Sequence, residues 1–397
     1  MTVWEVAKIL KIALYTYSTR PRGGVVHTLA LAEALQDAGN EVVIYALSRN
    51  GLSFFRPVKT AVKLIPFSSR SDEEFESRIL RYIDTYVEAL EEETLDTFDI
   101  HHAQDCISAN SLYQLREKGL IPFFCRTVHH LDDFTSPVLV QCQNRSVIEP
   151  DALITVSRYW QDRLESIYGR TSQVIYNGVE QRFFQEEGNR RLTYDQYELK
   201  GKTVFLTIGG IEPRKNTLGI LRAYARVKEI IPESVLLIVG GDTLFDYQYY
   251  RKSFFEELSR LPSYVQEGVR IVGAVDNQTL FHLYHIADCF VQPSIKEGWG
   301  LAILEAMAVG VPVIASDIPV FQEYLVDSHN ALLANPEDDE AIARQMIRVV
   351  KEKELAEMLV SNGKATAGRY TWMAAAREHM KLYRRMMNRG HAALSNP

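Results

Sequence analysis

Short apolar runs alternate with amphipathic runs along almost the whole chain of 397 residues. Such alternation is typical of βαβ units, in which parallel strands build one sheet and helices connect them. The pattern begins at Lys11 and begins again at Lys202. We therefore expect an α/β protein with two domains of about 180 residues each and a cleft between them.

The expected strands form two sets. The first set is 11–17, 41–47, 98–102, 122–129, 151–156 and 173–176, and the second is 203–208, 234–239, 269–272, 289–292 and 312–315. Helical patterns lie between them, among them 27–38, 72–93, 216–228, 301–309 and 337–350. We expect Asn335 to cap the last of these, with Pro336 in its first turn. The polar segment 180–201 is the expected linker, which puts the domain boundary after residue 182.

Composition and charge exclude several classes. Hydrophobic residues make up 46% of the chain and charged residues 24%, as in ordinary globular proteins, and the net charge of −7 argues against a general nucleic-acid binder. The four cysteines, Cys106, Cys125, Cys142 and Cys289, contain no CxxC pair, so we expect reduced, buried thiols. The N-terminal segment is expected to lead into a strand, not to act as a signal peptide, and no apolar stretch reaches the length of a membrane span.

We therefore expect a cytoplasmic protein, with peripheral contact at the inner membrane face left open. Segment 48–70 carries Arg49, Arg56, Lys59, Lys63 and Arg70 and no acidic residue. One interpretation is a solvated loop. The other is a rim that faces a membrane or a phosphorylated acceptor.

Glycine turns follow the expected strands in both halves. They are Gly23-Gly24, Gly209-Gly210, Gly240-Gly241 and Gly298-Trp299-Gly300. Glycine lets the backbone approach a ligand closely, and a helix N-terminus after such a turn favours an anion. The pattern indicates an anionic ligand, but it matches neither GxGxxG nor GxxxxGK[ST], which argues against a nicotinamide dehydrogenase and a P-loop NTPase.

Charged residues flank two of these turns. Arg214 and Lys215 suit a diphosphate, although a solvated charge pair is an equal alternative from the sequence alone. Glu297 and Glu305 lie on either side of the turn at 298–300. A carboxylate accepts two hydrogen bonds from vicinal hydroxyls, as in a sugar or ribose, whereas the alternative is a glutamate stabilised by the helix dipole.

The segment 297–305, followed by Ala306–Asp317 (AMAVGVPVIASD), resembles the E-x7-E region of retaining GT-B glycosyltransferases of family GT4. The preceding segment 283–294 (LYHIADCFVQPS) resembles that family too. Gly23–His27 (GGVVH) is similar to its N-terminal glycine loop, and 172–179 (SQVIYNGV) to its interdomain crossing strand. The resemblance covers about Lys11 to Met386.

The resemblance implies a GT-B fold of two Rossmann-like parallel-sheet domains that face a deep interdomain cleft. The nucleotide-sugar-binding C-terminal domain would be 183–370 and the acceptor-side N-terminal domain 1–182. The last segment, 371–397, would cross back onto the N-terminal domain. Carried over by motif, Glu297 would contact the donor sugar, Glu305 the ribose, Lys215 the diphosphate, and His129 the region of the anomeric carbon. The residues implied in donor binding are Gly23, Gly24, Gly209, Gly210, Arg214, Lys215, Gly240, Gly273, Gly298, Trp299, Gly300, Leu301 and Glu305.

The implied activity is retaining transfer of a hexosyl unit from a UDP- or GDP-sugar to an unidentified hydroxyl acceptor, which could be a lipid, a glycan or a small molecule. No spaced DxD motif is present, so we expect no metal and no cofactor, with His129, Glu297, Lys215 and Arg214 as the catalytic set. At Gly210 the chain departs from the family, since many members carry arginine there; Arg214 would supply the charge. The alternative function is a sugar-nucleotide epimerase or hydrolase on the same architecture.

Two residue pairs have open roles. His101 and His102 end an expected strand, where adjacent side chains face opposite ways, so they do not suit a single metal. Structural burial and contact with the acceptor are the alternatives for them. Asp132 and Asp133 could orient an acceptor hydroxyl, whereas His130, beside His129, could line the cleft.

Overall fold

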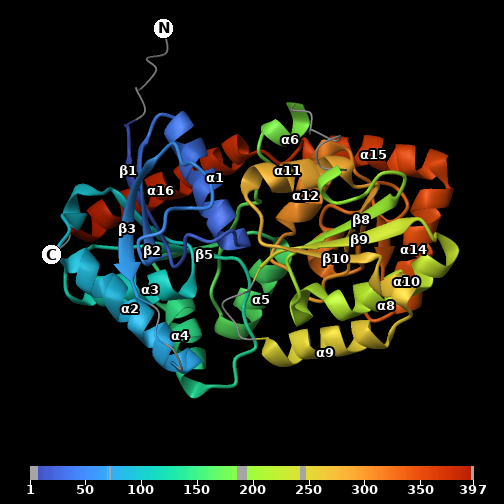
Figure 1. Cartoon of the computed structure of the whole chain (residues 1–397). Helices are drawn as coiled ribbons and strands as arrows, with labels where there is room; N and C mark the ends of the chain where they lie inside the picture. The colour runs from blue at the N-terminus through green and yellow to red at the C-terminus, as the bar shows by residue number, and fades with distance from the viewer. Residues whose placement is uncertain (1–7, 69, 71–72, 186–194, 242–246, 395–397) are drawn as a thin grey trace, which may run out of the picture. The chain divides into compact units, whose positions relative to one another are not determined.

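The computed structural model describes residues 8–68, 70, 73–185, 195–241 and 247–394, with the side chains of 389–394 left out. Contacts divide the chain into two compact units, coloured in chain order in Figure 1. Unit 1 comprises Met1–Gly178 and Trp372–Pro397, and unit 2 comprises Val179–Thr371. The C-terminal helix thus belongs to the same unit as the N-terminal half of the chain.

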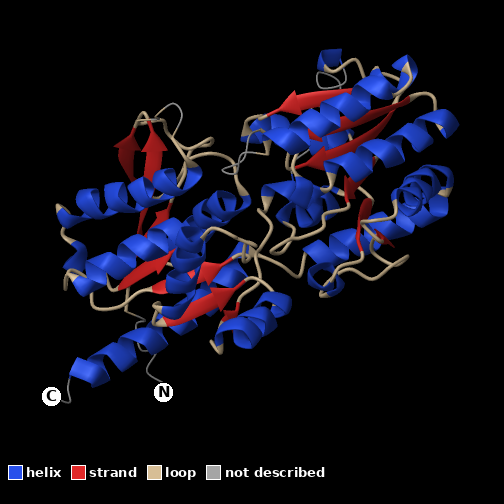
Figure 2. Ribbon diagram, turned by 90° about the horizontal axis from the view of Figure 1, so that it is seen from below, coloured by secondary structure: helices blue, strands red, loops and turns tan. Residues whose placement is uncertain are grey.

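Unit 1 is built on a seven-stranded sheet with the order β3-β2-β1-β4-β5-β6-β7, in which every pair is parallel. The strands are β1 (Lys11–Thr16), β2 (Glu41–Arg49), β3 (Ala61–Phe67), β4 (Ile100–Ala103), β5 (Cys125–Val128), β6 (Ala152–Thr155) and β7 (Gln173–Val174). The central strands are buried on both faces because helices cover the sheet from two sides (Figure 2), which is why they read as continuous apolar runs.

The helices of unit 1 follow the strands in sequence. They are α1 (Gly23–Asp37), α2 (Phe75–Glu91), η1 (Leu95–Thr97), α3 (Cys106–Glu117), α4 (Pro137–Ile148), α5 (Arg158–Tyr168) and α16 (Trp372–Leu394). Helices α1 and α16 pack side by side, as Figure 1 also shows. The first and the last helix of the chain therefore cover the same part of unit 1.

The expectation of a loop at 48–70 is wrong for 61–67, which form the edge strand β3. Its half-exposed residues alternate in burial, so no continuous apolar run marks it in the sequence. The basic side chains of this segment are also partly neutralised. Arg56 pairs with Glu33 at 2.7 Å, and Lys63 pairs with Glu93. Two of the five cations are therefore held by carboxylates of unit 1.

Unit 2 contains a six-stranded parallel sheet with the order β10-β9-β8-β11-β12-β13. The strands are β8 (Thr203–Ile208), β9 (Ser234–Val239), β10 (Val269–Gly273), β11 (Cys289–Gln292), β12 (Val313–Ser316) and β13 (Leu332–Ala334). The sequence missed β13, which has only three residues. The chain runs outward from β8 in one direction to β10 and then returns beside β8 with β11, so the strand order reverses between β8 and β11.

The helices of unit 2 are α6 (Arg182–Gln185), η2 (Pro213–Lys215), α8 (Thr217–Ile230), α9 (Gln248–Arg260), α10 (Ser263–Gln266), α11 (Asn277–Ile286), α12 (Leu301–Val309), α13 (Pro319–Gln322), α14 (Asp339–Lys351) and α15 (Lys353–Ala367). Helix α14 begins later than expected, because the side chain of Asp338, not that of Asn335, accepts the capping hydrogen bond from Ala341 N–H. The core lies between the sheet and α8 and α14, where apolar residues at helical spacing meet the strands.

The chain enters and leaves unit 2 at neighbouring positions. The Val179 N–H donates to the Tyr370 carbonyl at 3.0 Å, and Val179 forms an isolated bridge with Thr371. The expected linker at 180–201 contains α6, and its residues 186–194 lie outside the described part of the chain. None of the helices that the structure describes is both long and apolar enough to cross a membrane.

Candidate active site

Two loops of unit 2 leave the carboxyl ends of the adjacent strands β8 and β11. The first, 209–216, leads from β8 into α8, and the second, 293–300, leads from β11 into α12. The strand order reverses between these two strands, and ligands of open α/β sheets bind at such a point, outside the carboxyl ends of the strands. The fold therefore brings together the two charged turns singled out in the sequence.

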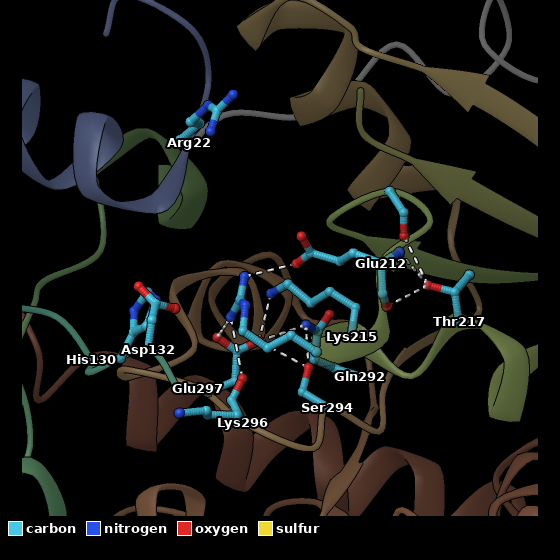
Figure 3. Close-up of polar contacts among 12 residues, drawn as sticks. Arg22, His130, Asp132, Glu212, Lys215, Thr217, Gln292, Ser294, Lys296 and Glu297 are labelled. Atoms are coloured by element: carbon cyan, nitrogen blue, oxygen red, sulfur yellow. Dashed lines mark hydrogen bonds and ion pairs between the residues drawn. The ribbon is translucent and has the colours of Figure 1, made fainter. Parts of the chain in front are cut away.

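Glu297 is the centre of this arrangement and is only 6% exposed. Its Oε1 accepts hydrogen bonds from Lys215 Nζ at 2.5 Å and from Ser294 Oγ at 2.9 Å, and its Oε2 accepts one from Arg214 Nη1 at 2.8 Å. Gln292 Nε2 lies 3.1 Å from the same Oε1. Figure 3 shows the Lys215 and Glu297 side chains pointing toward one another. A buried carboxylate is thus fixed by two cations and two neutral donors.

The charges in this cluster oppose the effect of burial. Burial by itself disfavours the ionised form of Glu297, but Lys215 and Arg214 outweigh it and hold the pKa of this carboxyl well below its usual range. Burial lowers the pKa of Lys215, whereas the Glu297 and Glu212 carboxylates raise it and Arg214 lowers it further. Glu297 is therefore a carboxylate across the physiological pH range, ready to accept hydrogen bonds.

Arg214 is held at both ends of its guanidinium. Nη1 donates to Glu297 Oε2 at 2.8 Å and to the Lys296 carbonyl at 3.2 Å, and Nη2 donates to Glu212 Oε1 at 2.9 Å. The Ile295 N–H donates to the Arg214 carbonyl at 2.9 Å, so this residue joins the two loops through its backbone as well. Its side chain is 27% exposed and is not a solvated surface charge.

The glycine turns at the ends of β8, β9 and β10 lie against one another. The Gly209 and Gly210 N–H groups both donate to the Val239 carbonyl, and the Gly240 N–H donates to the Gly273 carbonyl at 2.8 Å. At Gly240, with φ +136°, a Cβ would fall 2.4 Å from Gly210 N. Glycine is therefore required there, because a side chain would collide with the neighbouring backbone.

Gly209 and Gly210 are required for different reasons. A Cβ on Gly209 would lie 2.6 Å from Lys215 Cε, so glycine leaves room for the Lys215 side chain. Gly210 has φ +77°, a left-handed conformation that disfavours an arginine, and a Cβ there would lie 3.0 Å from the Gly241 carbonyl oxygen. The conformation of Gly210 in this structure thus does not suit an arginine.

The turn 298–300 leads directly into α12. Gly300, with φ +93°, packs so closely that a Cβ would lie 2.7 Å from Phe321 Cε1. The buried Trp299 packs on Tyr324, whose hydroxyl donates to the Trp299 carbonyl at 2.9 Å. Leu301 is the first residue of α12, and Gly298 is buried in the loop before it. The rigid packing of this turn orients the start of α12.

Glu305 lies one turn into α12 and does not join the Glu297 cluster. Its Oε2 accepts a hydrogen bond from Tyr284 Oη on α11 at 2.7 Å. Burial raises the pKa of Glu305 to about 7, against the effects of the Tyr284 hydrogen bond and of Arg182, while Glu180 adds to the increase. This carboxyl therefore titrates near neutral pH, unlike Glu297.

The remaining predicted site residues belong to unit 1. Gly23 and Gly24 open α1, whose N-cap Arg22 makes no side-chain capping bond. A Cβ on Gly24 would contact the His129 ring at 3.5 Å, so the ring of His129, directly after β5, lies against the start of α1. Among the described atoms, the buried Nε2 of His129 has no hydrogen-bond partner. A hydroxyl or a water molecule could pair with it.

His129 is part of a cluster of histidines that the sequence did not reveal. The His27 ring lies 4.8 Å from the His129 ring at 81° and 6.3 Å from the His379 ring, and His102 lies 5.6 Å from His379. His27 Nδ1–H donates to Asn177 Oδ1 at 2.8 Å, which fixes its tautomer. Burial lowers the pKa of His129 to about 3 and that of His379 to about 4. The cluster is therefore neutral.

His101 and His102 face opposite sides of β4, as expected. His101 Nδ1 bonds to Tyr15 Oη at 2.8 Å, whereas His102 bonds to Tyr383 Oη and to Thr127 Oγ1. Both histidines are buried, at 1% exposure or less, which favours the structural alternative. Asp132 Oδ1 lies 3.4 Å from Nε2 of His130, the residue that follows His129 in the sequence.

The sequence did not single out Glu212, Gln292, Ser294 and Tyr284, although each contacts a predicted site residue. The position of Gln292 and Ser294 at the end of a buried strand, where ligands bind in such sheets, was a usable signal. Glu212 stands two residues before Arg214, but nothing in the sequence indicates that its side chain would turn toward it. His27 and Asn177 lie in segments noted for their family resemblance, without a role of their own.

Two parallel α/β sheets, of seven and six strands, are the architecture of the GT-B fold, which solved structures similar to this chain share. Sucrose-phosphate synthase from Thermosynechococcus elongatus aligns with a TM-score of 0.77 and 22% identity, over 96% of this chain and 99% of that one. HepE from Anabaena, in complex with UDP and glucose, aligns with a TM-score of 0.76 and 18% identity, over 94% and 99% of the two chains. These likenesses establish the fold.

Family models match most of the sequence. Residues 21–183 match the model described as Glycosyltransferase Family 4, and residues 191–366 match Glycosyl transferases group 1. The phosphatidyl-myo-inositol mannosyltransferase of Mycolicibacterium smegmatis is 26% identical over 94% of this chain and 93% of its own length. The O-antigen chain mannosyltransferase B of Escherichia coli is 32% identical over 48% of each chain. The chain belongs to the GT4 glycosyltransferases, and it is an enzyme that uses a nucleotide-sugar donor.

Proposed function

We propose that the protein is a retaining, metal-independent glycosyltransferase that moves a hexosyl unit from a UDP- or GDP-sugar to a hydroxyl acceptor. The Glu297 cluster carries this proposal, because it holds an ionised carboxylate and two cations at the carboxyl ends of β8 and β11. A carboxylate recognises sugar hydroxyls, and cations recognise a diphosphate. A nucleotide sugar carries both the hydroxyls and the diphosphate, and the two lie next to each other in the molecule.

In this proposal the donor binds to unit 2. Glu297 would accept hydrogen bonds from the sugar hydroxyls, Lys215 would hold the diphosphate, and Glu305 would accept both ribose hydroxyls. Gly209, Gly210 and Gly240 let the glycine turns pack against one another and leave room for the Lys215 side chain. Gly23 and Gly24 of unit 1 would offer N–H groups at the start of α1 to the phosphates.

The reaction would break the bond between the anomeric carbon and the diphosphate oxygen and form one from the same carbon to the acceptor oxygen on the same face. The acceptor proton would pass to the leaving phosphate oxygen. Lys215 and Arg214, which are already oriented, would stabilise the negative charge that develops on that group. This supplies the charge that a divalent cation supplies in other transferases, and it supports the expectation that no metal is needed.

His129 would lie at the reacting sugar and bind an acceptor or sugar hydroxyl through Nε2. Its neutral state supports this role, because the lowered pKa leaves a ring that can accept or donate a hydrogen bond without carrying charge. The acceptor would bind mainly to unit 1. The names of two relatives, both mannosyltransferases, favour a mannosyl unit as the hexose.

The experiment is a thermal-shift screen of UDP- and GDP-sugars, followed by a transfer assay with and without EDTA. A ligand that binds only the native state raises the melting temperature. We expect one nucleotide class to stabilise the protein and transfer to survive chelation. Loss of transfer in EDTA with recovery in Mg²⁺ or Mn²⁺ would contradict metal independence. The comparisons do not favour an epimerase or hydrolase; epimer or free sugar as the main product without acceptor would revive it.

A further inference from the structure

A second carboxylate, Glu212, stands behind the proposed donor cluster. It is only 4% exposed and precedes η2 in the loop that follows β8. Residues at the start of a helix often cap it with a side chain, but Glu212 makes no side-chain capping bond. Its Oε1 instead accepts the hydrogen bond from Arg214 Nη2 at 2.9 Å. The burial of this charge is therefore not explained by the local helix geometry.

The backbone around Glu212 is fixed without help from its carboxylate. Thr217 Oγ1 donates to the Gly210 carbonyl at 2.9 Å, and the Lys215 N–H donates to the Glu212 carbonyl at 3.2 Å. The Asn216 side chain caps α8 by accepting from the Gly219 N–H and donates to the Pro336 carbonyl at 2.6 Å. The loop thus has its own hydrogen bonds, some of them at Thr217 in Figure 3, and the Glu212 carboxylate pairs with Arg214.

The charges of the cluster balance. Lys215 and Arg214 carry two positive charges, and Glu297 and Glu212 carry two negative ones, all joined by the contacts given above. Burial makes these interactions stronger than they would be in water. A nucleoside diphosphate would therefore enter a site with no net charge, although two cations lie in it. Removing either carboxylate would leave the site with an excess positive charge.

We propose that Glu212 is a tuning residue that weakens the hold of the donor site on the nucleoside diphosphate product. It does so in two ways: it cancels one positive charge, and it keeps the Arg214 guanidinium turned between two carboxylates. The consequence is faster release of the product, whose dissociation must follow every transfer. This inference rests on the proposed donor site in unit 2.

The test is calorimetric titration of UDP and of GDP into the whole chain and its Glu212→Gln variant. We expect Glu212→Gln to bind the preferred nucleoside diphosphate about tenfold more tightly, and product inhibition of transfer to strengthen by the same factor. Glu212→Asp keeps the charge and should stay within about twofold of wild type. Glu257→Gln is the matched control, because Glu257 pairs with Arg222 at 2.5 Å on the surface of the same unit.

A purely structural role for Glu212 gives the opposite sign. If Glu212 only holds the loop, Glu212→Gln would bind the nucleotide more weakly or equally, and that result overturns the inference. Thermal unfolding checks the variant, and Glu212→Ala removes the same charge if glutamine does not fit. Failure of wild type to bind either nucleotide would instead overturn the proposed function. Wild-type binding without tightening in the charge-removal variants overturns the inference alone.

Discussion

The polar groups at the two candidate sites differ in kind. In unit 1 they are neutral histidines, such as His27, His129 and His379, packed against one another with their pKa values lowered by burial. In unit 2 they are charged, with Glu297 held by Lys215 and Arg214. Burial therefore leaves the polar side chains of unit 1 neutral, whereas neighbouring cations keep the buried Glu297 of unit 2 ionised. The comparison teaches that burial alone does not decide the charge of a polar group, because the partners that the fold supplies can outweigh it.

Lowering the pH is the strongest test of this difference, because it should destabilise unit 1 more than unit 2. The pKa of a buried, neutral histidine lies below its unfolded value, so its contribution to stability is present above pH 6.5 and is lost as pH falls toward the folded value. Five buried histidines in unit 1 have lowered pKa values: His27, His101, His102, His129 and His379. The full slope of about 1.4 kcal/mol per pH unit is reached only well below pH 6.5, so each histidine costs about 1 kcal/mol between pH 6.5 and 5.5, and the five together cost unit 1 about 5 kcal/mol.

Hydrogen exchange measured by mass spectrometry at pH 7.0 and 5.5, corrected for the intrinsic rate, separates the two units. Peptides from β4, β5 and α16 should lose protection at the lower pH, whereas those from β8, β9 and α14 should lose much less. None of the described histidines of unit 2 is fully buried. An equal loss of protection in both units would contradict the proposed difference in electrostatics between them.

Removing the charge of Glu297 should have the next largest effect, on the rate of transfer. Glu297→Gln removes the carboxylate that would bind the sugar hydroxyls, and we expect kcat/KM for transfer to fall at least about a hundredfold, or about 3 kcal/mol. The nucleoside diphosphate itself should bind no more weakly, because the positive charges of Lys215 and Arg214 are freed. Transfer kinetics and calorimetry give the two values. A variant that kept full activity would separate Glu297 from the reaction.

Glu305 provides a test within unit 2, because burial raises its pKa to about 7 from a usual value of 4.5. Its contribution to stability is fully present below pH 4.5 and is lost as pH rises through 7, so Glu305→Gln should stabilise the protein by up to about 3 kcal/mol at pH 8. The same variant should bind nucleotide about tenfold more weakly. Wild-type affinity should fall as pH drops below 7, since the ionised form accepts both ribose hydroxyls.

Denaturant unfolding at pH 5 and pH 8, with nucleotide titrations at the same two values, measures both effects. The gain in stability should shrink at the lower pH. A variant that is destabilised at pH 8, or that binds nucleotide as wild type does, would show that Glu305 is a structural residue of α12.

The smallest expected effect lies in the neutral cluster. Asn177 fixes the tautomer of His27, which packs at 4.8 Å against His129. Asn177→Leu should lower kcat about tenfold with donor KM unchanged, because it disturbs a ring next to the proposed reacting group and not the donor site. Asn177→Gln keeps a neutral amide acceptor and is the matched control. A rise in donor KM with unchanged kcat would contradict this role of the cluster.

Much of the fold could be predicted from the sequence, because strands buried on both faces are apolar throughout. The runs at 203–208, 234–239 and 289–292 match β8, β9 and β11 residue for residue. The half-exposed edge strand β3 and the three-residue β13 carry no such signal and were missed. The capping residue of α14 was misplaced because Asn335 and Asp338 both suit that role, and only the side-chain geometry distinguishes them.

The sequence by itself determined that this chain has two parallel α/β sheets, and it singled out Glu297, Glu305 and Lys215 through a local pattern. Only the tertiary structure decided what these side chains contact. The strand order places β11 beside β8, which joins Arg214 to Glu297 across 83 residues, and α16 returns to unit 1, which joins His102 to Tyr383 across 281. The periodicity of apolar residues predicts which residues are buried. The order of the strands in the sheet decides which buried residues contact one another, and these contacts set the pKa values of the site residues.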